Sequence, residues 1–98
     1  RRKPVVALVS GKTIPPRLEK AFAAARLAPS AQNRQPWRFR IEQNAVIVTT
    51  DKSFSTSSLS KRLDCGIAML HFELGARAEG VLGQWEILPS PDVAKFIF

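Results

Sequence analysis

The sequence has 98 residues, of which 45% are hydrophobic and 23% are charged, and its net charge is +7. This length suits one domain with a modest core, and no segment reaches the roughly 20 apolar residues of a membrane span. A single cysteine excludes an internal disulfide, and the start of the chain does not resemble a secretory signal, so we expect a reducing, cytoplasmic setting. The excess of basic residues favours anionic partners such as phosphates, nucleic acids or acidic membranes, and charge alone does not choose among them.

The chain opens on a basic segment that leads into a short apolar run. Arg1, Arg2 and Lys3 precede Pro4, and residues 5 to 9 are apolar. A run of that length is compatible with a helical turn or with a strand. The basic residues are compatible with a solvated terminus or with a phosphate clamp. Because the chain starts without methionine and ends without a polar tail, we expect it to be a piece of something longer.

A helix is expected from about Arg17 to Ala28. Apolar residues recur there at helical spacing, at Leu18, Ala21, Phe22 and Ala25. Pro29 disfavours the helical conformation of the residue before it, so the helix should stop at or near residue 28.

An antiparallel hairpin is expected after a short loop. Residues 37 to 42 alternate apolar with polar side chains, and residues 45 to 50 are rich in β-branched side chains. The apolar members of the first strand are Trp37, Phe39 and Ile41. Gln43-Asn44 supplies the turn. A polar, serine-rich loop is expected from 51 to 58.

The segment from about Ser60 to Glu79 has a helical pattern that is apolar over much of its circumference. One stripe consists of Leu63, Ile67, Leu70, Leu74 and Ala78, and further apolar positions are Cys65, Ala68, Met69, Phe72 and Ala76. A helix of this kind is buried on more than one side. We therefore expect a second layer, from another subunit or from a missing half of the chain. Strands are expected at 84–88 and 95–98.

Few residues could bind a metal or act as a nucleophile. Cys65 and His71 are six positions apart, which places them on different faces of a helix, and no second pair of ligands exists. We expect no metal site. The apolar neighbourhood of Cys65 indicates an inert core residue, whereas His71 is expected to be half-buried with a hydrogen bond to a neighbouring layer. Ser30 lacks the setting of a catalytic triad, so no catalytic residue is predicted.

The segment from 24 to 39 has the most specific pattern in the chain. Its sequence, AARLAPSAQNRQPWRF, resembles the helix-loop-strand signature of the nitroreductase family of flavoproteins. The later segment LDCGIAMLHFELGAR resembles the core helix of the putative TM nitroreductase branch, in which two nitroreductase-like halves lie in one chain. The opening Arg-Arg-Lys-Pro resembles the start of the second half in that branch.

The resemblance implies an α+β fold with a mainly antiparallel sheet packed on the long buried helix. Residues 1–98 would form a single nitroreductase-like half domain, and two such units would enclose FMN at their interface. The cofactor-binding residues that the resemblance implies are Pro29, Ser30, Asn33 and Gln35, with Arg1 and Arg2 at the phosphate. The family pattern Arg-x-Ser-x-Arg is altered at Arg1 and Arg2, because the serine is missing and a proline follows.

The leading functional hypothesis is an FMN-dependent oxidoreductase unit. It would take hydride from NAD(P)H and reduce a small-molecule substrate such as a nitroaromatic or quinone, with a second half or a homodimer partner completing it. The alternative is a non-catalytic structural or dimerisation half that has lost its flavin site or only completes that of its partner. Nucleic-acid binding would require Trp37 and Phe39 to stack on bases. The alternation argues against it, because the hairpin needs that face for its core.

Overall fold

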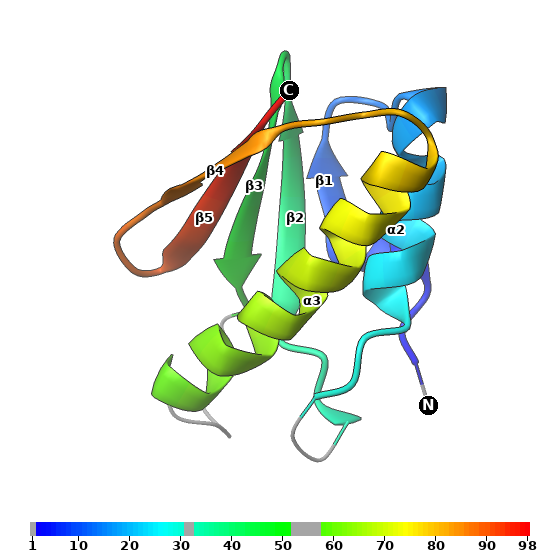
Figure 1. The fold of residues 1–98 in the computed structure, drawn as a ribbon. Helices are drawn as coiled ribbons and strands as arrows, with labels where there is room; N and C mark the ends of the chain where they lie inside the picture. Colours follow the sequence, from blue (N-terminus) through cyan, green and yellow to red (C-terminus); the bar gives the residue numbers. More distant parts are fainter. Residues whose placement is uncertain (1, 31–32, 52–57) are drawn as a thin grey trace.

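The computed structural model describes residues 2–30, 33–51 and 58–98 (Figure 1). The described residues form helices and strands that are mostly separated by short connections. In order they are α1 (Val5–Leu8), β1 (Val9–Gly11), the 3₁₀ turn η1 (Pro16–Leu18), α2 (Glu19–Arg26), β2 (Trp37–Glu42), β3 (Ala45–Thr50), α3 (Ser58–Ala78), β4 (Gln84–Ile87) and β5 (Asp92–Ile97).

The strands form one sheet in the order β1-β2-β3-β5-β4. β1 runs parallel to β2, whereas the β2–β3, β3–β5 and β4–β5 pairs are antiparallel. The predicted α+β class with a mainly antiparallel sheet is thereby confirmed. The predicted hairpin is β2–β3, which closes at Glu42 opposite Ala45. The apolar run at 5–9, which was compatible with a helical turn or a strand, contains both, because α1 passes directly into β1.

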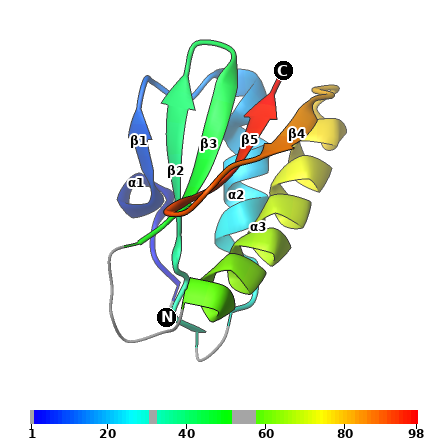
Figure 2. The same cartoon turned by 90° about the vertical axis from the view of Figure 1, so that its left-hand side faces the viewer.

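The helices α2 and α3 cover one face of the sheet (Figures 1 and 2). Phe72 of α3 lies at the centre of the core, with its ring 5.1 Å from that of Phe22 and 5.2 Å from that of Phe96. Trp37 and Phe39 of β2 face the same layer and are 0% and 1% exposed. Their rings are therefore unavailable for stacking on bases, as the alternation predicted.

Several element boundaries differ from those expected. The helix predicted over 17–28 begins as η1 and ends at Arg26. α3 starts at Ser58, two residues before the predicted start. Of the polar loop predicted over 51–58, Asp51 lies outside helices and strands as expected, and residues 52–57 lie outside the described residues. β5 starts at Asp92 instead of Lys95, because its pairing with β3 extends as far as Thr49, which lies opposite Asp92.

The two apolar sets on α3 have different environments. Cys65, Ala68, Phe72 and Ala76 are each 0% exposed and face the sheet. The stripe that the sequence singles out is exposed in this chain, with Leu63 at 64%, Ile67 at 38%, Leu70 at 57% and Leu74 at 58%. We call these four side chains the α3 stripe. Burial of α3 on a second side would therefore need a layer from outside the described residues.

Candidate functional site

The loop from Leu27 to Pro36 connects the end of α2 to the start of β2 (Figure 1). Leu27 still donates its backbone N–H to the carbonyl oxygen of Ala24 over 3.1 Å. The helix cannot continue, because Pro29 has no N–H and disfavours helical geometry before it. At the other end Pro36 is buried and Trp37 lies in the core. The loop is thus anchored at both ends.

Two residues of this loop have left-handed backbone conformations. The φ angle of Asn33 is 56° and that of Gln35 is 51°. Such a conformation costs an L-residue roughly 1–2 kcal/mol, and glutamine lacks the short side chain that helps asparagine to adopt it. Ser30 supports both positions, because its carbonyl oxygen accepts the N–H of Asn33 at 3.1 Å and its Oγ accepts the N–H of Gln35 at 2.9 Å. Strained backbone of this kind concentrates at binding and catalytic sites.

The side chain of Gln35 joins the loop to the N-terminal segment. Gln35 is 1% exposed. Its Oε1 accepts the backbone N–H of Lys3 at 2.6 Å, and its Nε2 donates to the carbonyl oxygen and the Oδ1 of Asn33 at 2.9 and 3.1 Å. Its amide is therefore bonded at both ends within the chain.

Three basic residues lie beside the loop, and we call Arg2, Lys3 and Arg26 the N-terminal cation cluster. Arg2 donates from Nη2 to the carbonyl oxygen of Leu27 at 2.9 Å, and Arg26 donates from Nε to that of Lys3 at 2.8 Å. The bond from Arg2 satisfies a carbonyl oxygen at the end of α2, where positive charge is favourable, and the bond from Arg26 ties that end of the helix to the N-terminal segment. Within residues 2–30, 33–51 and 58–98, no carboxylate pairs with the cluster and the buried Nε–H of Arg2 has no acceptor. An anion beside Arg2 would supply that partner.

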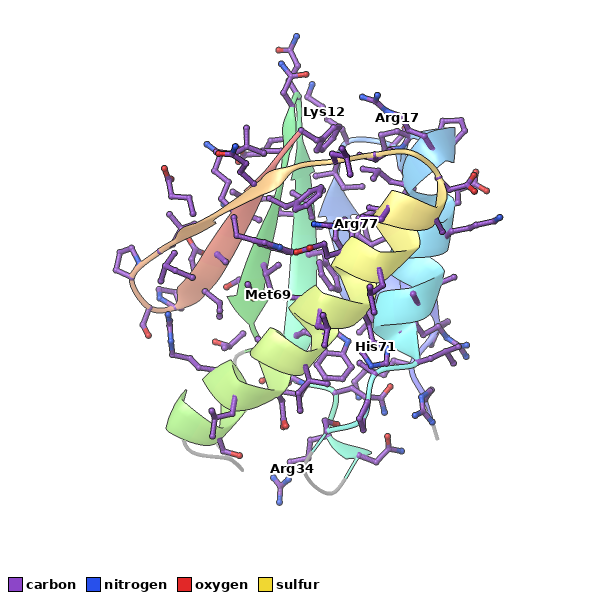
Figure 3. The ribbon with its side chains drawn as sticks, viewed as in Figure 1. Lys12, Arg17, Arg34, Met69, His71 and Arg77 are labelled. Carbon is purple, nitrogen blue, oxygen red and sulfur yellow. The ribbon has the colours of Figure 1, made fainter. Side chains whose placement is uncertain are left out.

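The structure brings most of the predicted cofactor-binding residues to one end of the molecule. Pro29 and Asn33 are exposed, Ser30 and Arg2 are half-buried, and Gln35 is buried. Arg1 lies outside the described residues. Sequence reasoning missed Arg26, although its position in the last helical turn before Pro29 places it beside the loop. Basic residues also lie elsewhere: Figure 3 shows Arg34 at the loop end and Lys12 and Arg17 at the opposite end.

Cys65 is a core residue, as predicted. It is 0% exposed, and burial, reinforced by the carboxylates of Asp64 and Asp51, raises the pKa of its thiol to about 12. His71 is half-buried, but its side chain makes no hydrogen bond within the described part of the chain, so the expected bond to a neighbouring layer is not found there. Among the described residues no group of three His, Cys, Asp or Glu side chains could hold a metal ion.

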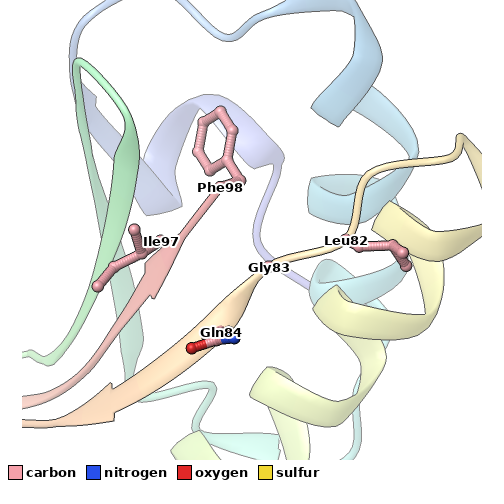
Figure 4. Close-up of a pocket in the computed structure, with 5 residues that line it drawn as sticks. All are labelled: Leu82, Gly83, Gln84, Ile97 and Phe98. Atoms are coloured by element: carbon pink, nitrogen blue, oxygen red, sulfur yellow. The ribbon is translucent and has the colours of Figure 1, made fainter.

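Two open hollows lie away from the loop. One, of about 380 Å³, is lined by Leu82, Gly83, Gln84, Ile97 and Phe98 (Figure 4). The other, of about 440 Å³, lies along β1 and is lined by residues 5, 6 and 9 to 14. The first has no charged side chain and the second has only Lys12, so neither combines the polar groups and strained backbone of the loop. No helix in the described ranges is both long and apolar enough to cross a membrane.

Comparison with known proteins identifies the family. The model of the family described as putative TM nitroreductase matches residues 1–76. The chain belongs to this nitroreductase family. The protein called putative NAD(P)H nitroreductase acg from two strains of Mycobacterium tuberculosis is 31% identical over 80 residues, which cover 76% of this chain and 24% of that protein.

A solved nitroreductase-fold structure supports the same assignment. The crystal structure of a putative nitroreductase from Thermotoga maritima superposes with a TM-score of 0.78 and 25% identity, over 99% of this chain and 42% of that one. The family signature at 24–39 lies inside the matched range and forms the strained loop described above. The chain spans 24% of the mycobacterial relatives and less than half of the solved structure.

Proposed function

We propose that the chain is one unit of an FMN-dependent, nitroreductase-like oxidoreductase that takes hydride from NAD(P)H and reduces a nitroaromatic, quinone or similar acceptor. Family membership supports the oxidoreductase class, and the name of the mycobacterial relatives supports the reductant. The proposal depends chiefly on the loop, in which the family signature folds into strained backbone beside the N-terminal cation cluster. A cytoplasmic location is part of the same proposal.

The polar groups of the loop fit one edge of a flat heteroaromatic ring. Pro29 offers exposed apolar surface, and Asn33 of the same loop is also exposed. The Oγ of Ser30 accepts from Gln35, and its own O–H has no acceptor within the described residues, so it remains available to donate. Because the amide of Gln35 is bonded to Lys3 and Asn33, we assign Gln35 to holding the loop around the cofactor. A few donors and acceptors in an apolar wall are typical of cofactor sites.

The N-terminal cation cluster fits the phosphate of the same cofactor. Arg2 would contact the phosphate, with Arg1 from the same segment, while Lys3 and Arg26 add positive charge. The acceptor that the buried Nε–H of Arg2 lacks within the described chain supports this assignment. Bound FMN would provide the chemistry of hydride and electron transfer between NAD(P)H and the acceptor, so no side chain here is required as an acid or base.

The α3 stripe supports a partner unit. Four large apolar side chains lie exposed along one helix face, which is unusual for a surface that stays in water. The solved relative is more than twice as long as the matched region. We therefore propose that a second nitroreductase-like unit packs on the stripe, either from the same polypeptide or from a second copy.

The competing function is a structural half without its own flavin. Its support is the buried Gln35, whose amide is already bonded within the chain, together with the altered phosphate pattern at Arg1 and Arg2. Such a half would contribute the α3 stripe and complete the pocket of its partner.

An absorbance and titration experiment separates the two functions. The complete protein is purified, its visible spectrum is recorded, and FMN is added while the quenching of flavin fluorescence is followed. We expect flavin absorbance and oxidation of NAD(P)H by a nitroaromatic or a quinone. Arg2→Gln should weaken FMN binding, whereas the control Lys12→Gln, at the opposite end of the molecule (Figure 3), should not. A colourless protein that does not take up FMN would exclude the enzyme and leave the structural half.

A further inference from the structure

Three charged side chains connect the exit of the loop to the first turns of α3. Lys61 of α3 lies with its Nζ 3.0 Å from the Oδ1 of Asp51, and Nη2 of Arg38 lies 3.7 Å from the Oδ2 of the same carboxylate. We call this group the Arg38–Asp51–Lys61 bridge. Its members come from β2, the residue after β3, and α3. The side chain of Lys61 is 8% exposed and that of Asp51 is 17% exposed, so the pair is largely removed from water.

The bridge also holds the backbone of the loop where it enters β2. Nη1 of Arg38 donates to the carbonyl oxygens of Gln35 at 3.0 Å and Trp37 at 2.6 Å. The backbone N–H of Asp51 donates to the carbonyl oxygen of Pro36 at 2.7 Å. The carbonyls of three consecutive residues, 35 to 37, are therefore bonded to two members of the bridge.

Lys61 fixes Asp51 in two ways. Its ammonium group contacts the carboxylate and also donates to the backbone carbonyl oxygen of Asp51 at 3.2 Å. Burying an ion pair stabilises a fold little compared with burying apolar groups of the same volume, because the charges lose their hydration. What the bridge does provide is a defined direction for the carbonyls that follow the left-handed Gln35.

We propose that the Arg38–Asp51–Lys61 bridge is a positioning device that sets the backbone geometry of loop residues 33–36 from α3. The inference rests on the proposed flavin function, since the loop is the proposed wall of that pocket. None of the three residues needs to touch the cofactor; they act through the backbone of Gln35 and Pro36. Because α3 also carries the α3 stripe, the bridge connects the pocket to the surface on which the partner unit would pack.

Amide hydrogen exchange of the complete protein tests the positioning without requiring flavin. The probes are the amides of Asn33 and Gln35, which are bonded to Ser30, and the reference amides lie in the β3–β5 pairing. Lys61→Met should accelerate exchange of the probes on the order of tenfold relative to the reference, because the loop opens locally. Lys61→Arg, which keeps the charge and can reach Asp51, should restore slow exchange.

Arg62 provides a matched control from the same helical turn. Its guanidinium donates to the carbonyl oxygens of Asp92 at 2.8 Å and Leu88 at 3.3 Å, at the β4–β5 connection and away from the loop. Arg62→Met should lower the overall stability without selective exchange of Asn33 and Gln35. FMN affinity is measured in parallel, and Lys61→Met should weaken it roughly tenfold, the lower end of the effect of residues that orient ligand-binding groups.

The outcomes separate the two proposals. Selective exchange of the loop with weaker FMN binding supports both. If Lys61→Met selectively accelerates exchange of the loop amides but the wild-type protein binds no FMN, the positioning role is supported and the flavin function is wrong. If Lys61→Met accelerates all amides equally, or leaves both the loop amides and FMN affinity unchanged, the bridge has no positioning role and the inference is wrong.

Discussion

The backbone N–H of Lys3 donates to the Oε1 of Gln35 over 2.6 Å, and the bond joins residues 32 positions apart. It ties the segment that carries Arg2 to the loop that carries Ser30 and Asn33. The cationic part and the polar part of the proposed pocket are thus connected through one buried amide. Gln35 has a left-handed backbone conformation, and its buried amide bonds to Lys3 and Asn33.

Replacing Gln35 with alanine should therefore destabilise the protein. Gln35→Ala leaves the N–H of Lys3 without its acceptor and removes both side-chain bonds to Asn33, so we expect the free energy of unfolding to fall by about 2 kcal/mol. Urea denaturation followed by tryptophan fluorescence measures the change. The control Gln43→Ala, at an exposed position of the β2–β3 turn, should stay within about 0.5 kcal/mol. Equal stability of the two variants would show that the Gln35 amide does not hold the segment.

Local signals predicted much of this architecture. Pro29 ends the helix and the alternation of Trp37, Phe39 and Ile41 defines the hairpin, because both effects act over a few residues. The buried state of Gln35 could not be predicted, since its acceptor role depends on Lys3, far away in the sequence. Its position in the signature pointed to the site, but not to the direction of its amide.

The face of α3 that packs on the sheet could not be predicted from the sequence either. Both of its apolar sets recur at helical spacing, so periodicity cannot tell which one faces the sheet. The choice is made by the fit of Phe72 among the rings of Phe22, Phe39 and Phe96, which come from three other elements. The Arg38–Asp51–Lys61 bridge could not be predicted either, because the alternation in the strand indicates only that Arg38 faces away from the core.

The thiol of Cys65 should be unreactive in the folded protein. Its pKa is raised from 9.0 to about 12, first by burial and then by Asp64 and Asp51, so at pH 8 it is protonated as well as inaccessible. We expect alkylation by iodoacetamide to proceed only as fast as the protein unfolds, and urea-unfolded protein to react rapidly as the control. Rapid alkylation under native conditions would contradict the buried position.

The same shift predicts a pH dependence of stability. Because the thiol has a higher pKa in the folded protein than in the unfolded chain, the unfolded chain loses its proton first as the pH rises. The contribution of Cys65 to the free energy of unfolding is therefore fully present below pH 9.0 and is lost between pH 9.0 and about 12. The stability advantage of the wild type over Cys65→Ala should shrink across this window. Denaturation midpoints of both proteins measured side by side at increasing pH would show it, and a constant difference would argue against the shift.

Gly75 allows α2 and α3 to cross closely. A Cβ atom at this position would lie 2.6 Å from the carbonyl oxygen of Lys20 and 2.7 Å from the Cα of Ala21. Since backbone cannot move aside easily, Gly75→Ala should destabilise the chain by roughly 1–3 kcal/mol, measured by chemical denaturation. Gly66→Ala is the matched control on the same helix, because a Cβ there meets nothing within 4 Å. It should stabilise the chain by up to about 1 kcal/mol through helix propensity.

Substitutions in the α3 stripe test whether a partner unit packs on this surface. Leu70 and Leu74 are 57% and 58% exposed, so Leu70→Asp and Leu74→Asp should change the stability of the isolated chain little. If a second unit packs on the stripe, each variant buries an unpaired carboxylate on assembly and should weaken it at least roughly tenfold. Sedimentation velocity detects this as dissociation when the units are separate copies, and a lower unfolding midpoint detects it when they share a polypeptide. Leu82→Asp, 71% exposed but outside α3, is the control. Assembly that is unaffected by Leu70→Asp and Leu74→Asp would place the partner on another face.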